Sequence, residues 1–370
     1  MTPIRILVVD DSVVIRKLLS DALSGDHALE VVGVASDGRI ALAKIPHLKP
    51  DLITLDIEMP VMNGLETLTA VRKLYPKLPV IMFSTLTARG AAATLDALSL
   101  GASDYATKPS NTGSPAAAME RIRAELIPKI KVLCGILVPL KLLPLPGCSP
   151  AVKLRVRNNP RIEIVAIGSS TGGPNALAEV LPRIPNDFPV PIVVVQHMPP
   201  IFTSLLAERL ASRSAIPVEE GRAGVALSPG HAWIAPGNFH MKVVRGVNWR
   251  LDLNQDPQEN SCRPAVDVLF RSVAKACGGN VLGVVMTGMG SDGVLGALAI
   301  RDAGGDVIIQ DEASSVVWGM PGLVHASGLD DAAYPLDHLA PEIIRRVLQS
   351  RGSRTHFQMK TYAALEPPAK

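Results

Sequence analysis

Three carboxylates stand directly after predicted strands near the start of this 370-residue chain. Asp10 and Asp11 follow the apolar run at residues 4–9, and Asp56 follows the run at residues 52–55. The carboxyl ends of parallel strands meet at one edge of a doubly wound sheet, so these acids should lie close together. Crowded carboxylates repel one another unless a cation is bound, and oxygen ligands favour a hard ion such as Mg²⁺. The spacing therefore predicts a Mg²⁺ site at these acids.

Further polar groups are expected at the same edge. Thr85 ends the next predicted strand beside Ser84, and Lys108 ends the one after it, just before Pro109. A hydroxyl and an ammonium placed there could hold the oxygens of a phosphoryl group that arrives on Asp56. A single strand-end acid is often only a helix cap, but the recurrence of such groups at successive strand ends favours a phosphoryl site.

The loop GSSTGGP at residues 168–174 follows another apolar run and allows two interpretations. A glycine loop that opens a helix can bind phosphate on its backbone N–H groups, but the G-x-G-x-x-G spacing and the lysine of a P-loop are both absent here. The alternative is the G-x-S-x-G nucleophile elbow, in which a tight turn presents the Ser170 hydroxyl beside amides that can bind an oxyanion. We favour the elbow.

A serine nucleophile needs a base and an acid that orients the base. His197 directly follows the apolar run at residues 192–196, and Asp292 lies in the loop after the run at residues 281–286. Because all three residues follow predicted parallel strands, a triad of Ser170, His197 and Asp292 is expected at one sheet edge. The rival bases are His231, His240 and His325, and the serious rival to Asp292 is Asp311.

The elements that would position these groups form two α/β domains. Short apolar runs alternate with helical patterns in both parts of the chain, which predicts mostly parallel, doubly wound sheets. Residues 1–132 should form a five-stranded domain, and residues 161–350 a second domain with a β-hairpin. The hairpin strands are expected at residues 230–235 and 239–244, flanking a turn at residues 236–238.

The stretch at residues 133–160 is predicted to be a linker, and residues 351–370 a disordered tail. No acidic residue lies between Glu125 and Glu163, whereas basic residues and prolines are frequent. This composition is typical of a semi-rigid, solvated spacer. A contact surface for an acidic partner stays open as the alternative.

Composition excludes several classes of protein. Lys and Arg total 37 against 34 for Asp and Glu, and the resulting net charge of +3 argues for neither a nucleic-acid nor a membrane partner. The cysteines show no zinc spacing and no disulfide framework. No segment has the pattern of a signal peptide or the length of a membrane span. A cytoplasmic enzyme or regulator is therefore expected.

The motifs VVDDS, LDIEMPVMNG, FSTLT and DYATKPS resemble those of response-regulator receiver domains, which have a flavodoxin-like fold. The resemblance covers residues 4–132. It implies that Asp56 accepts a phosphoryl group from a histidine kinase, with Mg²⁺ placed by Asp10 and Asp11. Thr85 would then switch rotamer, and Lys108 would pair with the phosphate.

A second set of motifs resembles the catalytic domain of the CheB-type protein-glutamate methylesterase/glutaminase family over residues 163–348; these are AIGSSTGGPNAL, VVVQHMPPIFTSLLAERL, WIAPGNFHM, RPAVDVLF, VVMTGMGSDGVLG and DEASSVVWGMP. A receiver domain before this catalytic domain is that family's architecture. The resemblance implies that Ser170 is the nucleophile, His197 the base and then the acid, and Asp292 the orienting acid. The oxyanion would bind near Thr171 and Met289, and hydrolysis would need no cofactor.

The resemblance also implies a substrate and a mode of control. The expected reaction removes methyl groups from glutamate γ-methyl esters on the cytoplasmic helices of chemotaxis receptors, and deamidates glutamines. The receiver domain would block the Ser170 cleft until it is phosphorylated. The residues alone leave open a non-enzymatic module whose glycine loop binds a phosphorylated ligand. A DNA-binding regulator is disfavoured, because no helix-turn-helix pattern with a basic recognition helix follows the linker.

Overall fold

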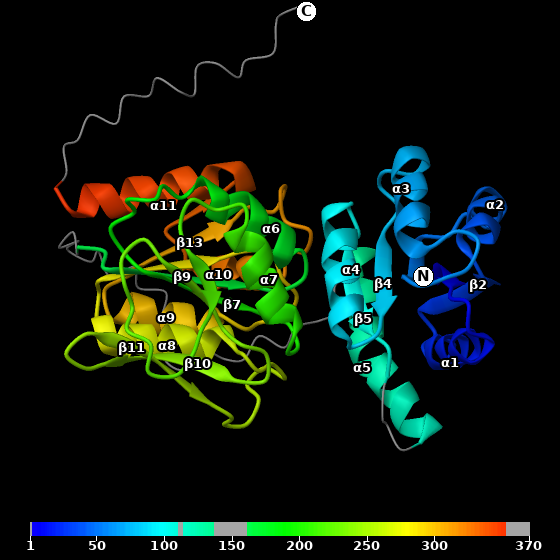
Figure 1. The fold of residues 1–370 in the computed structure, drawn as a ribbon, viewed down its shortest axis with the longest axis horizontal. Helices are drawn as coiled ribbons and strands as arrows, with labels where there is room; N and C mark the ends of the chain where they lie inside the picture. Colours follow the sequence, from blue (N-terminus) through cyan, green and yellow to red (C-terminus); the bar gives the residue numbers. More distant parts are fainter. Residues whose placement is uncertain (1, 110–113, 137–160, 353–370) are drawn as a thin grey trace, which may run out of the picture.

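The computed structural model describes residues 2–109, 114–136 and 161–352, which form two α/β domains side by side (Figure 1). Most of the linker expected at residues 133–160, and most of the tail expected at residues 351–370, lie outside the described residues. Within the described part, no helix is both long and apolar enough to cross a membrane.

The N-terminal domain is a parallel sheet in the order β2-β1-β3-β4-β5. This is the flavodoxin-like order, so the expected fold is confirmed. Helices from the crossover connections cover the sheet, which explains the nearly continuous apolar strands. The elements are β1 (Ile4–Val9), α1 (Val13–Leu23), β2 (Leu29–Ala35), α2 (Gly38–Leu48), β3 (Leu52–Asp56), α3 (Gly64–Leu74), β4 (Val80–Ser84), α4 (Ala88–Ser99), β5 (Asp104–Thr107) and α5 (Pro115–Leu133).

Side-chain caps begin the helices that follow the acid-bearing loops. The Ser12 hydroxyl accepts a hydrogen bond from Ile15 N at the start of α1. Asn63 and Glu66 form a reciprocal capping box at the start of α3. These caps satisfy backbone donors that would otherwise be unpaired, and they hold the loops after β1 and β3 in place.

The C-terminal domain contains a parallel sheet in the order β14-β13-β12-β6-β7-β9-β8 and a separate antiparallel hairpin, β10-β11. The mostly parallel fold with a hairpin is confirmed. The elements are β6 (Ile164–Ser169), α6 (Gly173–Val180), β7 (Ile192–Gln196), α7 (Phe202–Ala211), β8 (Val218–Glu220), β9 (Ala232–Ile234), β10 (His240–Arg245), β11 (Trp249–Asn254), α8 (Val266–Cys277), β12 (Val281–Val285), α9 (Val294–Asp302), β13 (Asp306–Gln310), α10 (Met320–Ala326), β14 (Ala332–Tyr334) and α11 (Leu336–Ser350), with a short 3-10 helix at Leu181–Arg183.

The expected partners within the hairpin are wrong. β9 lies inside the parallel sheet between β7 and β8, and β10 pairs with β11 rather than with β9. The physical reason is burial: every residue of β9 is buried, as in a strand covered on both faces, whereas β10 and β11 each keep exposed positions. The turn at residues 236–238 therefore leads from one sheet to the other.

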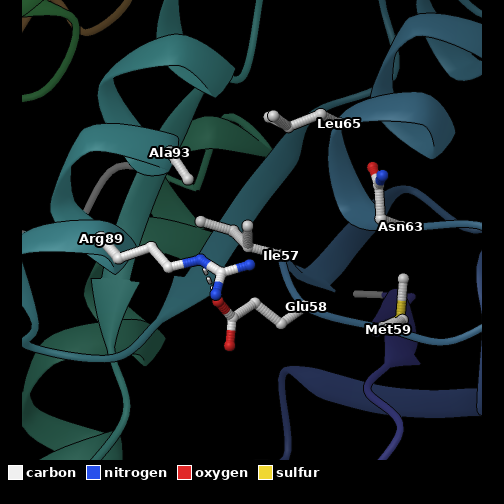
Figure 2. A pocket seen from close by; sticks show the side chains of 7 residues that line it. All are labelled: Ile57, Glu58, Met59, Asn63, Leu65, Arg89 and Ala93. Atoms are coloured by element: carbon white, nitrogen blue, oxygen red, sulfur yellow. Dashed lines mark ion pairs between the residues drawn. The ribbon is translucent and has the colours of Figure 1, made fainter.

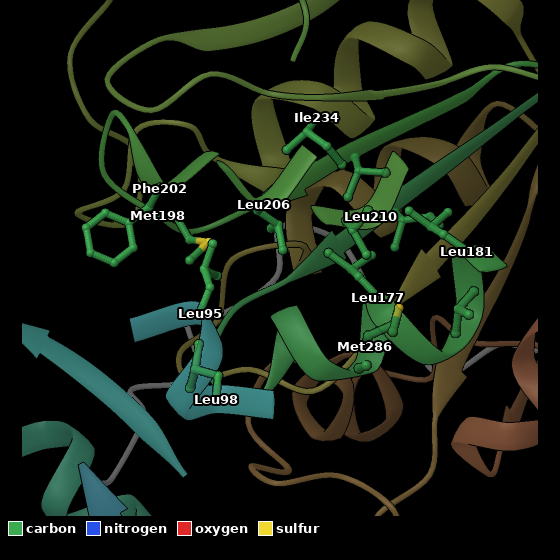
Figure 3. Close-up of a cluster of buried hydrophobic side chains, with 14 of the residues drawn as sticks. Leu95, Leu98, Leu177, Leu181, Met198, Phe202, Leu206, Leu210, Ile234 and Met286 are labelled. Carbon is green, nitrogen blue, oxygen red and sulfur yellow. The ribbon is translucent and has the colours of Figure 1, made fainter. Parts of the chain in front are cut away.

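The domains meet where α4 and β5 pack against α6 and α7 (Figure 1). Figure 3 shows Leu95 and Leu98 of α4 close to Met198 and Phe202 of the C-terminal domain. Tyr105 of β5 stacks on Phe202, with ring centroids 5.0 Å apart. One buried apolar cluster therefore continues across the domain boundary.

Candidate functional sites

The acids expected at the Mg²⁺ site lie together at the carboxyl edge of the N-terminal sheet. One carboxylate oxygen from each of Asp10, Asp11 and Asp56 lies within 4.8 Å of the others. Asp10 and Asp56 are buried, and Asp11 is exposed. The Lys108 ammonium lies 2.8 Å from Asp10 Oδ2 and 2.8 Å from Asp56 Oδ1. The structure thus brings these four predicted residues together.

Burial and the contacts of Lys108 act in opposite directions on the pKa values of this cluster. It raises the pKa of Asp56 to about 6, aided by the charge of Asp10 and opposed by the hydrogen bond and charge of Lys108. Burial lowers the pKa of the Lys108 ammonium, but its hydrogen bonds to Asp10 and Asp56 outweigh that effect and raise it. A divalent cation would favour the ionised carboxylates more strongly than one ammonium does.

The donor set fits a magnesium ion. All the ligand atoms are carboxylate oxygens, and Mg²⁺ binds through one or two such groups while keeping waters for a phosphate. Asp11 is exposed, and its carboxylate makes no ion pair within the described ranges, so it is available to an incoming ion.

Thr85 lies at the same edge without a contact to the acids. Its hydroxyl is 3.3 Å from the Thr87 hydroxyl, and the Ser84 hydroxyl donates to Gly90 O at 3.1 Å. Among the residues that the structure describes, neither hydroxyl bonds to Asp56. The sequence therefore placed Thr85 at the right strand end, and its phosphate contact stays a prediction.

A pocket of about 450 Å³ opens next to Asp56, between the loop after β3 and α4 (Figure 2). Glu58 and Arg89 form an ion pair at 3.2 Å beside it, as the dashed line in Figure 2 marks. Sequence analysis did not single out this pair, because Glu58 lies in the loop after β3 and Arg89 in the first turn of α4, and the two share no local pattern. The lining residues are Ile57, Glu58, Met59, Asn63, Leu65, Arg89 and Ala93.

The three residues predicted as a triad lie at one edge of the C-terminal sheet. β12, β6 and β7 are neighbours in the sheet, and they are followed by Asp292, Ser170 and His197 respectively. His197 Nε2 lies 2.7 Å from Asp292 Oδ2. The carboxyl edge of parallel strands thus gathers side chains that are far apart in sequence.

Asp292 is firmly held. Its side chain is 2% exposed and accepts further hydrogen bonds, 2.6 to 3.1 Å long, from Val266 N, Asp267 N, Gly293 N and Asn260 Nδ2. Burial would raise the pKa of Asp292, but the bond to His197, the charge of that ring and the backbone donors of α8 outweigh burial and lower it. These contacts therefore favour the ionised form of Asp292, which can orient the His197 ring.

His197 has partners at both ring nitrogens. Cys262 Sγ lies 3.6 Å from Nδ1, and Asp292 occupies Nε2. Burial would lower the pKa of His197, but Cys262 and Asp292 outweigh burial and raise it to about 10. The arrangement therefore favours a protonated ring.

Ser170 is held through its backbone rather than its hydroxyl. Its N–H donates to Thr287 O at 3.1 Å, and its carbonyl accepts from Gln196 Nε2 at 2.9 Å and from Gly173 N at 2.8 Å. The hydroxyl makes no hydrogen bond to any described residue. Ser170 thus shares an edge with the His197–Asp292 pair without being bonded to it.

The amides expected to bind an oxyanion are free to do so. Neither the Thr171 nor the Met289 N–H donates to an acceptor in the described part of the chain. The two loops are close, because a Cβ on Gly288 would lie only 2.8 Å from Ser170 Cβ. Glycine is required there by the close approach of the Ser170 loop.

The rival groups have partners outside the triad. His231 stacks on Trp233, His240 Nε2 contacts Pro257 O, His325 Nδ1 contacts Asp330, and Asp311 accepts from Ser314. Geometry therefore favours His197 and Asp292 over these alternatives.

Sequence analysis missed residues that hold Asp292 in place. Asn260 Nδ2 lies 2.9 Å from both Asp292 Oδ1 and Asp267 Oδ2. Burial raises the pKa of Asp267 to about 6, and the charge of Asp292 adds to the rise. In the sequence, Asp267 is recognisable only as an acid in the first turn of a helix. Asn260 lies in a loop whose sequence pattern does not indicate its partners.

The Ser170 loop also contacts the N-terminal domain. The Thr171 hydroxyl donates to Asp104 Oδ2, and Asn175 Nδ2 donates to Leu98 O, both at 2.8 Å. Nearby, Arg209 of α7 bonds to Asp96 Oδ1 at 2.7 Å and to Ser99 Oγ at 2.8 Å. These bonds place α4 and β5 directly beside the Ser170 loop.

Two family models match the chain. Residues 6–120 match the response regulator receiver domain, and residues 165–343 match CheB methylesterase. A protein-glutamate methylesterase/protein-glutamine glutaminase of Trichodesmium erythraeum (strain IMS101) is 56% identical over 351 residues, covering 94% of this chain and 100% of that protein. Its counterpart in a Nocardioides species is 52% identical over 363 residues, covering 95% of this chain and 98% of that protein.

Two solved structures match the separate domains. The catalytic domain of Thermotoga maritima CheB methylesterase is 41% identical and covers 50% of this chain and 98% of that chain, with a TM-score of 0.49. The response regulator domain of Thermotoga maritima CheB is 45% identical and covers 35% of this chain and 94% of that chain, with a TM-score of 0.31.

Proposed function

The chain belongs to the protein-glutamate methylesterase/protein-glutamine glutaminase family, and from this we propose that it hydrolyses glutamate γ-methyl esters and deamidates glutamines on chemoreceptor helices by means of Ser170, His197 and Asp292. The observation that carries the proposed mechanism is the 2.7 Å contact between His197 and the buried Asp292, at the sheet edge where Ser170 follows β6. No cofactor is proposed for hydrolysis.

The proposed reaction starts with transfer of the Ser170 hydroxyl proton to His197 Nδ1, since Nε2 faces Asp292. The Ser170 oxygen attacks the ester carbonyl. The bond to methoxide then breaks as His197 returns the proton to form methanol, and an acyl-enzyme remains. His197 next takes a proton from water, which attacks the acyl carbonyl. As the bond to the Ser170 oxygen breaks, His197 returns that proton to the oxygen, and the carboxylate product leaves. With glutamine, the same path releases ammonia.

The oxyanion of the tetrahedral intermediate would bind the amides of Thr171 and Met289. Their N–H groups are unengaged within the described residues, and they lie on the two loops that meet at Ser170 and Gly288. One such donor typically contributes about 3 kcal/mol to the stabilisation of a transition state.

Control would come from phosphorylation of Asp56 by a cytoplasmic histidine kinase. Asp10, Asp11 and Asp56 would hold Mg²⁺, which when bound neutralises charge on the phosphoryl oxygens. Lys108, 2.8 Å from Asp56 Oδ1, would pair with the phosphoryl group, and the Thr85 hydroxyl would turn toward it.

The receiver domain would inhibit the hydrolase until that happens. α4 and β5 contact the loop next to Ser170, so a receptor helix would have to displace them to reach the nucleophile. Shifting such an equilibrium from 1:99 to 99:1 needs about 5.5 kcal/mol of differential stabilisation.

A serine-reactive fluorophosphonate tests the hydrolase. We expect peptide mapping to find the label on Ser170 in the wild type and to find none in His197→Ala. Ser170→Ala should lower the release of methanol from methylated receptor by about 10⁶-fold, because the nucleophile is lost. A phosphate-binding module without hydrolase activity would instead leave Ser170 unlabelled, and substantial methanol release by folded Ser170→Ala would overturn the assignment.

A further inference from the structure

The Cys262 thiol contacts the His197 ring nitrogen that accepts the Ser170 proton in the proposed reaction. Cys262 Sγ lies 3.6 Å from His197 Nδ1, a distance within the range of a sulfur hydrogen bond. Cys262 is half-buried, so part of the residue is accessible to solvent. Nε2 of the same ring is taken by Asp292, and the Ser170 hydroxyl is bonded to neither nitrogen within the described chain. In the proposed reaction, Cys262 and Ser170 would therefore need the same nitrogen, Nδ1.

A tight turn holds Cys262 at this position. The backbones of Glu259 and Cys262 exchange two hydrogen bonds, of 3.1 and 2.9 Å. Between them, Asn260 and Ser261 have φ values of 52° and 61°. Successive non-glycine residues in the left-handed region are unfavourable, and they persist where surrounding contacts hold them. Asn260 supplies such contacts through its bonds to Asp267 and Asp292.

On the basis of the proposed function, we propose that Cys262 is a positioning residue for hydrolysis: its thiol shares a proton with His197 Nδ1 before substrate binds, and it releases that nitrogen to the Ser170 hydroxyl when the reaction begins. On release the proton stays on sulfur, and Nδ1 keeps its lone pair. The O–H bond of Ser170 then breaks as the Nδ1–H bond forms, so the exchange needs no other reactant.

The charges around the pair agree with this role. Asp292 contacts Nε2 of the ring. Asp267 of α8 interacts with the charges of Asp292 and Arg271, and Arg271 forms an ion pair with Glu259 at 2.6 Å. Burial lowers the pKa of His197, but Cys262 and Asp292 together raise it to about 10. A ring that is protonated at neutral pH cannot accept the proton of Ser170. His197 therefore cannot act as the base while Nδ1 contacts Cys262.

The test is the pH dependence of kcat/KM for methanol release from a methylated receptor fragment, measured on the full chain. In Cys262→Ala and Cys262→Ser, we expect the acid limb of the profile to move to lower pH, because the base loses a group that keeps it protonated. On that limb, each pH unit of displacement appears as about a tenfold rise in kcat/KM. A merely structural role would change the height of the profile without moving the limb.

Cys134→Ser is the matched control. Cys134 is also half-buried, but it lies at the end of α5 in the receiver domain, where its Sγ is 3.9 Å from Asp51 O. We expect this variant to leave the profile unchanged. Alkylation by iodoacetamide gives a second measurement, because the thiolate is the reacting form and a protonated His197 ring beside it would stabilise that form. Cys262 should react faster in the wild type than in His197→Gln.

The outcomes separate the two proposals. Ser170 labelled by fluorophosphonate, together with an unmoved acid limb in both Cys262 variants, would overturn the role of Cys262 and leave the hydrolase standing. Equal alkylation of Cys262 in the wild type and folded His197→Gln would overturn it too. Folded wild-type protein with neither labelling of Ser170 nor methanol release would overturn the proposed function itself.

Discussion

The Thr171 hydroxyl donates a 2.8 Å hydrogen bond to Asp104 Oδ2, which joins the residue after the proposed nucleophile to a strand of the receiver domain. Both side chains are buried, and Lys129 lies 3.3 Å from the same carboxylate oxygen. A buried hydrogen bond to a charged acceptor is stronger than one to a neutral acceptor. The state of the receiver domain can therefore act on the Ser170 loop through a single side chain.

Asp104→Asn should raise the basal esterase activity of unphosphorylated protein. The change keeps the shape of the side chain but removes its charge, which costs the closed state about 1 kcal/mol and raises the open fraction roughly fivefold. Methanol release without a phosphodonor measures this. Asp21→Asn, which alters an exposed acid of α1 that pairs with Lys17, is the control. Equal basal activity in all three proteins would argue against inhibition through this contact.

Asp11→Asn should weaken phosphorylation by weakening the Mg²⁺ site. It removes an exposed carboxylate from the three that lie within 4.8 Å of one another, and loss of such a ligand should raise the Mg²⁺ concentration needed by at least about tenfold. Intact mass after incubation with an acyl phosphate, across a Mg²⁺ titration, measures the phosphorylated fraction. A chelator should abolish the signal in the wild type, and an unaltered titration in Asp11→Asn would exclude Asp11 as a ligand.

Gly288→Ala should damage activity more than stability. The added Cβ would lie 2.4 Å from Met320 Sδ and 2.8 Å from Ser170 Cβ, so the Ser170 loop must shift. A displacement of about 1 Å at a reacting group can lower the rate by about 100-fold. Gly246→Ala is the control, since the nearest atom to its new Cβ is Asn248 O at 3.2 Å, in the β10-β11 turn. Comparing kcat with the unfolding midpoint separates the effects, and unchanged kcat in Gly288→Ala would contradict this geometry.

Glu342 should stabilise the C-terminal domain in a pH-dependent way. Burial would raise the pKa of Glu342, but hydrogen bonds from Arg345, Arg346 and Tyr334 outweigh it and lower the pKa to about 2. Because the folded-state pKa lies below the unfolded value of about 4.5, this stabilisation is present above pH 4.5 and is lost as pH falls toward 2.

Glu342→Gln should therefore lower the free energy of unfolding by about 2 kcal/mol at neutral pH and flatten its fall between pH 4.5 and 2. Tryptophan fluorescence during urea unfolding reports this domain, since all three tryptophans, Trp233, Trp249 and Trp318, belong to it. Glu312→Gln, at an exposed acid, is the control. If the free energy of unfolding falls in parallel with pH in the wild type and in Glu342→Gln, Glu342 is not the source of the pH-dependent stabilisation.

The sequence alone was sufficient to predict the N-terminal sheet, the four neighbouring strands β13, β12, β6 and β7 of the C-terminal sheet, and the edges that carry chemistry. Apolar runs that end in Asp10, Asp56 and His197 identify buried parallel strands, and parallel strands place their carboxyl ends on one side. That rule needs no knowledge of packing, which is why the acid cluster and the His197–Asp292 pair were predictable. The roles of these residues in catalysis and phosphoryl transfer stay predictions.

Only the tertiary structure decided which loops touch. The contacts of Cys262 with His197, of Asn260 with Asp292 and of Thr171 with Asp104 join residues in loops or separate domains, where no periodicity indicates a partner. The pairing of β10 with β11 was missed for the same reason, since short strands next to a turn leave the choice of partner to burial. Local patterns determine where a strand or helix begins and ends, whereas contacts between irregular segments depend on how the finished layers pack.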